Sequence, residues 1–202
     1  MKKMKLTPVK TAAVAVVITL FGTMATYQSA SADDVQIRAI PGLKLITMDN
    51  LRSIKRLNIM TCKGRPVTMW GTSGHDYIVG TPGPDVIYAG AGNDRVDGRG
   101  GNDIICGGPG NDTLNGNAGN DTIYGGNGHD TINGHSGNDR LFGQRGEDRM
   151  YGGPGKDKMF GGPDYDSLNG NAGSDYLNGG VGNNGCDGGS GANTLINCSP
   201  TK

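Results

Sequence analysis

The chain has 202 residues, of which 38 are glycine and only 5% are aromatic, so the composition excludes an ordinary globular core. The formal net charge is zero, but residues 71–196 alone carry seven basic and sixteen acidic side chains. This acidic excess disfavours nucleic acid as a partner and favours cations.

Residues 1–32 have the pattern of a secretory signal peptide. Four lysines lie within the first ten residues, the apolar run AAVAVVITLF follows, and Ala-Ser-Ala precedes an expected cleavage between Ala32 and Asp33. An uncleaved membrane anchor is the alternative, but the apolar run is short for a transmembrane helix. We therefore expect a secreted protein whose mature chain has 15 basic and 19 acidic residues, a net charge of −4.

Residues 33–70 are expected to form an N-terminal cap segment. The stretch TMDNLRSIKRLNIM (47–60) has apolar residues three apart and predicts a short basic amphipathic helix, whose cations face either solvent or a membrane or partner. Met69 precedes Ile78 by nine residues, so we expect TMW (68–70) to be an incomplete first strand that seals one end of the fold.

Residues 71–196 consist of fourteen copies of a nine-residue repeat, without insertions. Position 1 is glycine except for Ala89, and position 4 is glycine except for Asp164. Position 6 is aspartate in the first twelve copies and then Asn184 and Asn193, while position 8 is apolar in every copy. Four repeat positions, 1, 4, 6 and 8, keep the same residue type over 126 residues, which does not arise by chance. The repeat must therefore organise the fold.

One copy combines a bend with a short strand. Glycine at positions 1 and 4 permits the backbone angles of a tight bend. The last three residues are β-prone, and only the middle one is apolar, so its side chain should point inward while its neighbours point outward. A bend and a strand make a half-turn, so the fourteen copies predict an all-β solenoid of about seven coils, each of 18 residues.

The predicted core is thin, because only one side chain in nine points inward. The aspartate of each copy would also lie beside an aspartate of the next coil and repel it. A multivalent cation between the coils would offset both effects. Without such a cation we expect the chain to be disordered.

The repeats resemble a known family. GGPGNDTLN (107–115) and GGNGHDTIN (125–133) fit the G-G-x-G-x-D-x-U-x nonapeptide of the RTX, or haemolysin-type, calcium-binding repeats. The resemblance implies a parallel β-roll with calcium between the bends of copies n and n+2. The ligands would be bend carbonyls and the position-6 carboxylates. The carboxylate ligands that it implies are Asp76, Asp85, Asp94, Asp103, Asp112, Asp121, Asp130, Asp139, Asp148, Asp157, Asp166 and Asp175.

Twelve carboxylates make ten such pairs, which implies at most about ten calcium sites. Copy 11 departs from the pattern at Asp164, and we interpret Asn184 and Asn193 as a C-terminal cap followed by a tail of residues 197–202. Most RTX proteins attach their repeats to a toxin, protease or lipase. Here the non-repeat part is small, and the entry sequence CKGRPVTMWG (62–71) resembles that of small secreted actinobacterial calcium-binding repeat proteins.

The alternation of half-turns predicts two different outer faces. On the face of the even-numbered copies, position 9 forms a mainly aromatic stripe: Tyr88, Cys106, Tyr124, Phe142, Phe160 and Asn178. The other face is mostly polar. The uncovered end of the stripe, at Tyr124, Phe142 and Phe160, could contact a protein or a glycan. The alternative is that the rings stack and only stiffen the sheet.

The four cysteines of an exported chain predict two disulfides, for which three connectivities can be drawn. Our hypothesis is that Cys62–Cys106 pins the segment before Cys62 over the stripe, and that Cys186–Cys198 staples the C-terminal end.

The sequence thus predicts a secreted, non-catalytic calcium-binding protein whose roll folds on binding several Ca²⁺. An adhesion or matrix protein that uses the roll as a scaffold is the alternative. An enzyme is disfavoured, because His75, His129 and His135 all lie in bends and no nucleophile–base or G-x-S-x-G pattern is present in the sequence.

Overall fold

The computed structural model describes residues 61–200. The predicted signal peptide (1–32), the helix expected within residues 47–60 and the last two residues of the tail lie outside the described residues. Within residues 61–200 there is no helix long and apolar enough to cross a membrane.

Two parallel sheets of eight strands form the body of the fold. Sheet I contains β3 (Met69–Trp70), β5 (Val86–Tyr88), β7 (Ile104–Pro109), β9 (Thr122–Asn127), β11 (Arg140–Arg145), β13 (Lys158–Pro163), β15 (Tyr176–Val181) and β17 (Thr194–Ile196). Sheet II contains β4 (Tyr77–Val79), β6 (Arg95–Asp97), β8 (Thr113–Ala118), β10 (Thr131–Ser136), β12 (Arg149–Gly155), β14 (Ser167–Gly173), β16 (Gly185–Asp187) and β18 (Ser199–Pro200).

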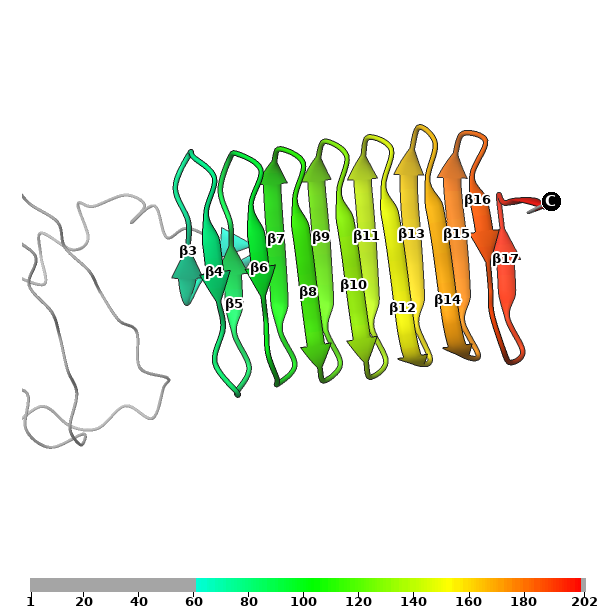
Figure 1. Ribbon diagram of the computed structural model, residues 1–202, viewed down its shortest axis with the longest axis horizontal. Coiled ribbons are helices and arrows are strands. Elements are labelled where there is room, and N and C mark those ends of the chain that lie inside the picture. The colour runs from blue at the N-terminus through cyan, green and yellow to red at the C-terminus, as the bar shows by residue number, and fades with distance from the viewer. Residues whose placement is uncertain (1–60, 201–202) are drawn as a thin grey trace, which may run out of the picture. The chain divides into compact units, whose positions relative to one another are not determined.

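The chain alternates between the two sheets, so that every strand pairs with the strand one coil away. Ile132, for example, is in register with Leu114 on one side and Met150 on the other, each 18 residues distant. Figure 1 shows that the strands of one sheet point opposite to those of the other and that both run across the axis along which the coils stack. The predicted parallel β-solenoid of about seven 18-residue coils is therefore confirmed.

The core is a single file of eighth-position side chains between the sheets. Buried members of this file are Ile87, Val96, Ile105, Leu114, Ile123, Ile132, Leu141, Met150, Met159, Leu168, Leu177 and Cys186. The sequence predicted that all fourteen would point into the core. Leu195 is instead 46% exposed, because it belongs to the last coil and no further coil covers it.

Glycine is required where adjacent coils approach closely. Gly110 has a φ of 140°, and a Cβ there would collide with the carbonyl oxygen of Gly92 in the preceding coil. Asp164 replaces this glycine in copy 11 and still adopts a positive φ of 84°. The bend of copy 11 therefore keeps the backbone shape of its neighbours.

Both predicted disulfides are present, Cys62–Cys106 and Cys186–Cys198. Cys62 belongs to an antiparallel hairpin of β1 (Thr61–Cys62) and β2 (Arg65–Pro66), and β1 contacts β5 and β7. The hairpin thus covers the first part of the aromatic stripe, whereas the segment before Cys62, which we expected at this place, lies almost entirely outside the described residues. At the other end the tail adds β18, which pairs with β16 and extends sheet II beyond the predicted repeats.

The uncovered part of the stripe is a stack of rings. The centroids of Tyr124 and Phe142 are 4.8 Å apart, and those of Phe142 and Phe160 are 5.1 Å apart, with nearly parallel planes. Lys63 of the hairpin caps the stack, with Nζ 4.8 Å from the Tyr124 ring centroid. The stacking that we gave as an alternative role for the stripe is therefore present.

We predict that Leu141→Ala destabilises the roll more than Leu195→Ala, although both residues occupy position 8. Leu141 is fully buried, so its truncation should lower the free energy of unfolding by about 2–5 kcal/mol. The exposed Leu195 should cost less than about 1 kcal/mol. Urea unfolding in calcium, followed by circular dichroism, measures both values. Equal losses would contradict the inward placement of Leu141.

Candidate metal centre

The position-6 aspartates form one column along each edge of the roll. Copies with odd numbers contribute Asp76, Asp94, Asp112, Asp130, Asp148 and Asp166, and copies with even numbers contribute Asp85, Asp103, Asp121, Asp139, Asp157 and Asp175. All except Asp76 are buried. The bends hold these side chains inside the roll, because each Asp lies directly between a tight turn and a strand.

One oxygen of each carboxylate joins the coils by a hydrogen bond. The backbone N–H of Asp94 donates to Oδ1 of Asp112 at 2.8 Å, and the N–H of Asp112 donates to Oδ1 of Asp130 at 2.8 Å. The same bond recurs along both columns. Oδ1 is therefore occupied by the backbone of the preceding coil.

The second oxygen is buried without a hydrogen-bond donor. This holds for Oδ2 of Asp94, Asp103, Asp112, Asp121, Asp130, Asp139, Asp148, Asp157, Asp166 and Asp175. A buried carboxylate oxygen without a partner is costly. Ten such atoms in register within residues 61–200 indicate a repeated function for this position.

The first-position glycine shows what Oδ2 faces. A Cβ on Gly107 would collide with both Oδ2 of Asp112 and the carbonyl oxygen of Gly125 in the next coil. The same pair of oxygens surrounds Gly125 and Gly134. In these bends an anionic carboxylate oxygen and a partly negative carbonyl oxygen thus lie close to the same point, and Oδ2 has no donor.

The C-terminal copies place a donor at this point. Asn184 Nδ2 contacts the carbonyl of Asn197 in the next coil at 3.4 Å, whereas Asn193 Nδ2 donates to the carbonyl of Gly188 in its own copy at 2.8 Å. Their Oδ1 atoms still accept from the backbone N–H groups of Asp175 and Asp166. The expected cap is thus formed by an amide that supplies the positive group missing from the aspartate copies.

The first two copies use a different donor. Oδ2 of Asp76 accepts from the backbone N–H of Thr72 at 2.6 Å and from its hydroxyl at 2.9 Å. Thr81 makes the same two contacts to Asp85, at 2.7 and 3.0 Å. The sequence analysis missed these threonines. The sequence feature that could have identified them is position 2 of the repeat, which is threonine only in these two copies.

The fifth-position side chains form a second ladder beside the carboxylates. His75 Nδ1 accepts from the N–H of Asn93 at 2.8 Å, Asn93 Oδ1 from Asn111 at 2.9 Å, and Asn111 Oδ1 from His129 at 2.9 Å. His129 Nδ1 in turn accepts from Glu147 at 3.0 Å. Two of the three histidines therefore have a structural role in the bends.

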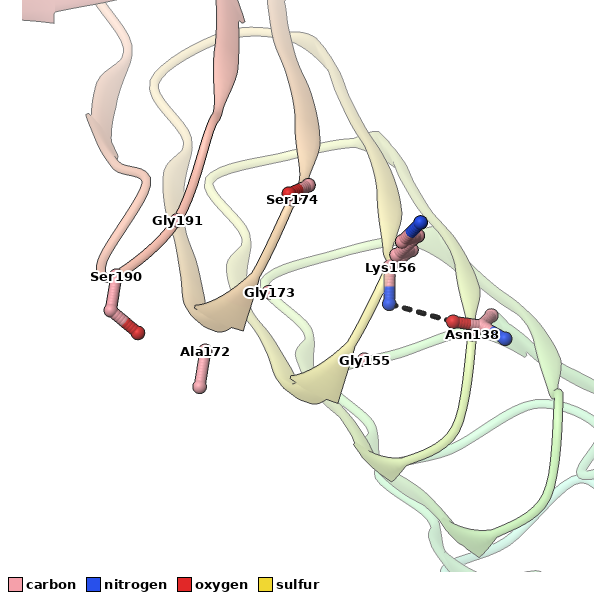
Figure 2. Close-up of a pocket in the computed structure, with 8 residues that line it drawn as sticks. All are labelled: Asn138, Gly155, Lys156, Ala172, Gly173, Ser174, Ser190 and Gly191. Carbon is pink, nitrogen blue, oxygen red and sulfur yellow. Dashed lines mark hydrogen bonds between the residues drawn. The ribbon is translucent and has the colours of Figure 1, made fainter.

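The other edge has the same ladder, which ends at a surface hollow shown in Figure 2. The N–H of Lys156 donates to Asn138 Oδ1 at 2.8 Å, and the lysine side chain offers no acceptor to continue the series. Small residues such as Ala172 and Ser174 then leave a shallow depression on the outer side of the bends. The carboxylate positions lie inside the bends and are separate from this hollow.

Burial raises the pKa of the column carboxylates. Removal from water is the largest cause, repulsion by carboxylates in adjacent coils adds to it for most of them, and the backbone hydrogen bond to Oδ1 opposes it. The pKa is about 7 for Asp130, Asp139 and Asp148 and about 6 for Asp103, Asp112, Asp157 and Asp166.

These oxygens fit a hard cation. Within residues 61–200 no three His, Cys, Asp or Glu side chains converge on one point, so the other ligands of any bound metal would be mainly backbone carbonyls. Carboxylate and carbonyl oxygens are the ligands that Ca²⁺ prefers. A cation near Oδ2 and the facing carbonyl would compensate both atoms.

A parallel two-sheet solenoid with carboxylate columns inside its bends is the architecture of a cation-binding β-roll. The model of the RTX calcium-binding nonapeptide repeat matches residues 70–105, 107–141, 133–168 and 166–195. The chain belongs to this family, as the resemblance of its repeats indicated, and this membership supports calcium binding by the repeats. No curated protein matches the chain.

We predict that the calcium-free roll is stabilised by acid. An unfolded aspartate has a pKa near 3.9, and the folded values of about 6–7 mean that the folded state binds more protons between these limits. The stabilisation is complete below about pH 4 and is lost as the pH rises through 6–7. Circular dichroism in chelator should therefore show more β-structure at pH 5 than at pH 8. A signal that grows with pH in chelator would contradict this.

Proposed function

We propose that the protein is a secreted, non-catalytic calcium-binding protein whose β-roll folds as Ca²⁺ ions occupy the bends. The observation that carries this proposal is the set of ten buried Oδ2 atoms without a donor. The ligands would be these oxygens and the carbonyls that face them.

The two ends of the roll support the proposal. Where aspartate is replaced by Asn184 or Asn193, an amide Nδ2 takes the place of Oδ2 and donates to a backbone carbonyl. Where the aspartates are Asp76 and Asp85, threonine donors occupy Oδ2. We therefore assign calcium to the ten carboxylates from Asp94 to Asp175, with Asp76 and Asp85 as parts of a metal-independent first coil.

Secretion is supported by the N-terminal sequence and by the cysteines. Both disulfides join residues of the roll or its hairpin, and such bonds persist in oxidising compartments outside the cytosol. Extracellular calcium modules bind with dissociation constants of about 10⁻⁴–10⁻³ M. The low calcium inside a cell would leave the chain unfolded until it is exported.

Calcium titration tests folding on binding. We expect the β-signal in circular dichroism at pH 7.5 to rise with Ca²⁺ and to be lost on addition of chelator. Mg²⁺ should be a poor substitute, because it keeps its water ligands and demands a strict octahedral geometry. A β-signal that is independent of calcium would overturn the proposal.

Asp112→Asn tests the site itself. The new amide can donate to the carbonyl of Gly125, as Asn184 does to the equivalent carbonyl of Asn197 in the next coil. We expect calorimetry to show a loss of about one ion per chain and the calcium-free variant to retain more β-structure than the unmodified protein. Asp187→Asn, an exposed residue outside the columns, is the control and should change neither quantity. An unchanged stoichiometry in Asp112→Asn would contradict the assignment.

A further inference from the structure

Sheet I presents an outer face with positive charge only. None of its eight strands contains an acidic residue, whereas sheet II contains Asp97 and Asp187. Arg140 and Lys158 are directly paired in neighbouring strands and are both exposed. Arg145 ends β11 and is also exposed. We call Arg140, Arg145, Lys158 and the capping Lys63 the cationic face.

A shallow groove runs across this face beside the ring stack. Its volume is about 280 Å³, and it is lined by Gly108, Pro109, Gly126, Asn127, Gln144 and Arg145. The groove forms where Gly108 and Gly126 are paired and leave no side chain on the surface. Its walls offer amide groups of Asn127 and Gln144 and the guanidinium of Arg145. The nearest acidic residue along the chain, Glu147, lies in the bend after β11.

Calcium would change the charge of the whole roll. Residues 61–200 contain nine basic and sixteen acidic residues, a net charge of −7, and twelve of the acids belong to the columns. Four Ca²⁺ ions would add eight positive charges and reverse the sign. The four acidic residues outside the columns are outnumbered by the nine basic ones. In the calcium-loaded state the surface charge is therefore positive, and the cationic face becomes attractive to polyanions.

The ring stack argues against two classes of polyanion as the partner, single-stranded nucleic acids and anionic membranes. Single-stranded nucleic acids bind by stacking bases on exposed aromatic faces, but Tyr124, Phe142 and Phe160 cover one another, and Lys63 lies over the Tyr124 ring. The rings are half-buried, so they do not form the exposed apolar surface that inserts into a membrane. Hydroxyl and amide groups of Thr122, Asn127 and Gln144 instead suit the hydroxyl groups of a sugar.

We propose that the cationic face of the calcium-loaded protein binds an acidic polysaccharide along the stack of coils. The cations would pair with its acid groups, and the groove would accept part of the sugar chain. Arg140 and Lys158 are one coil apart, about 4.8 Å, which allows both to act on one extended chain. This inference rests on the proposed calcium function, because the acidic columns must first be neutralised.

The test is binding of the full mature chain to dextran sulfate, with dextran of the same length as the uncharged probe. In the presence of calcium we expect dextran sulfate to bind, and dextran to bind at least about tenfold more weakly because it carries no charge. The affinity for dextran sulfate should fall as the salt concentration rises, because salt screens the ionic contacts. Arg140→Gln with Lys158→Gln should weaken binding about fivefold or more. Arg95→Gln with Arg149→Gln removes the same charge from exposed positions of sheet II and should weaken it less than about twofold.

Equal losses in the two double variants would overturn the proposal, because binding would then follow total charge. Tighter binding to single-stranded DNA or to anionic phosphatidylserine vesicles would overturn it as well. Circular dichroism with calcium is recorded on every variant. Normal calcium-induced folding without binding to dextran sulfate would refute the polysaccharide site alone, whereas loss of calcium-induced folding in the unmodified protein would refute the proposed function.

Discussion

The structure depends on the space between an aspartate Oδ2 and the backbone carbonyl of the next coil. Both atoms are electron-rich, and ten Oδ2 atoms of the two columns are withdrawn from water without a hydrogen-bond donor. A thin core with one apolar side chain per nine residues has little capacity to compensate for such repulsion. In the proposed function, a positive group at this position decides whether neighbouring coils can stay stacked, and the same need recurs at every nine-residue step of residues 71–196.

The roll itself shows three chemical solutions to this constraint. Threonine donors cap Oδ2 in the first coil, asparagine amides replace Oδ2 in the last, and the ten copies between them retain a free oxygen. The donors at the two ends are side-chain and backbone groups of the protein itself, so they do not depend on metal. The central copies require protons or a cation, so the stability of the centre should respond to conditions more strongly than that of the ends.

Aromatic and covalent contacts complement the carboxylate columns. The hairpin of β1 and β2 is fixed by Cys62–Cys106 and places Lys63 over the first ring of the stack on sheet I. Cys186–Cys198 holds the last coils together and positions β18 for pairing with β16. The same ring stack leaves the cations of sheet I exposed beside it. Stiffening of the sheet and presentation of a charged face are therefore compatible roles of one surface.

The sequence by itself determined the solenoid, because a nine-residue period with one inward position admits only stacked half-turns, and it also determined which aspartates share an edge. It further predicted both disulfides, since the alternation of faces places Cys106 on the outer surface. Only the tertiary structure decided which carboxylate oxygens lack a donor, because the answer depends on atoms one coil away. Thr72 and Thr81 occupy position 2, which varies along the repeat, yet the geometry of the bends directs their donors to Oδ2 of Asp76 and Asp85.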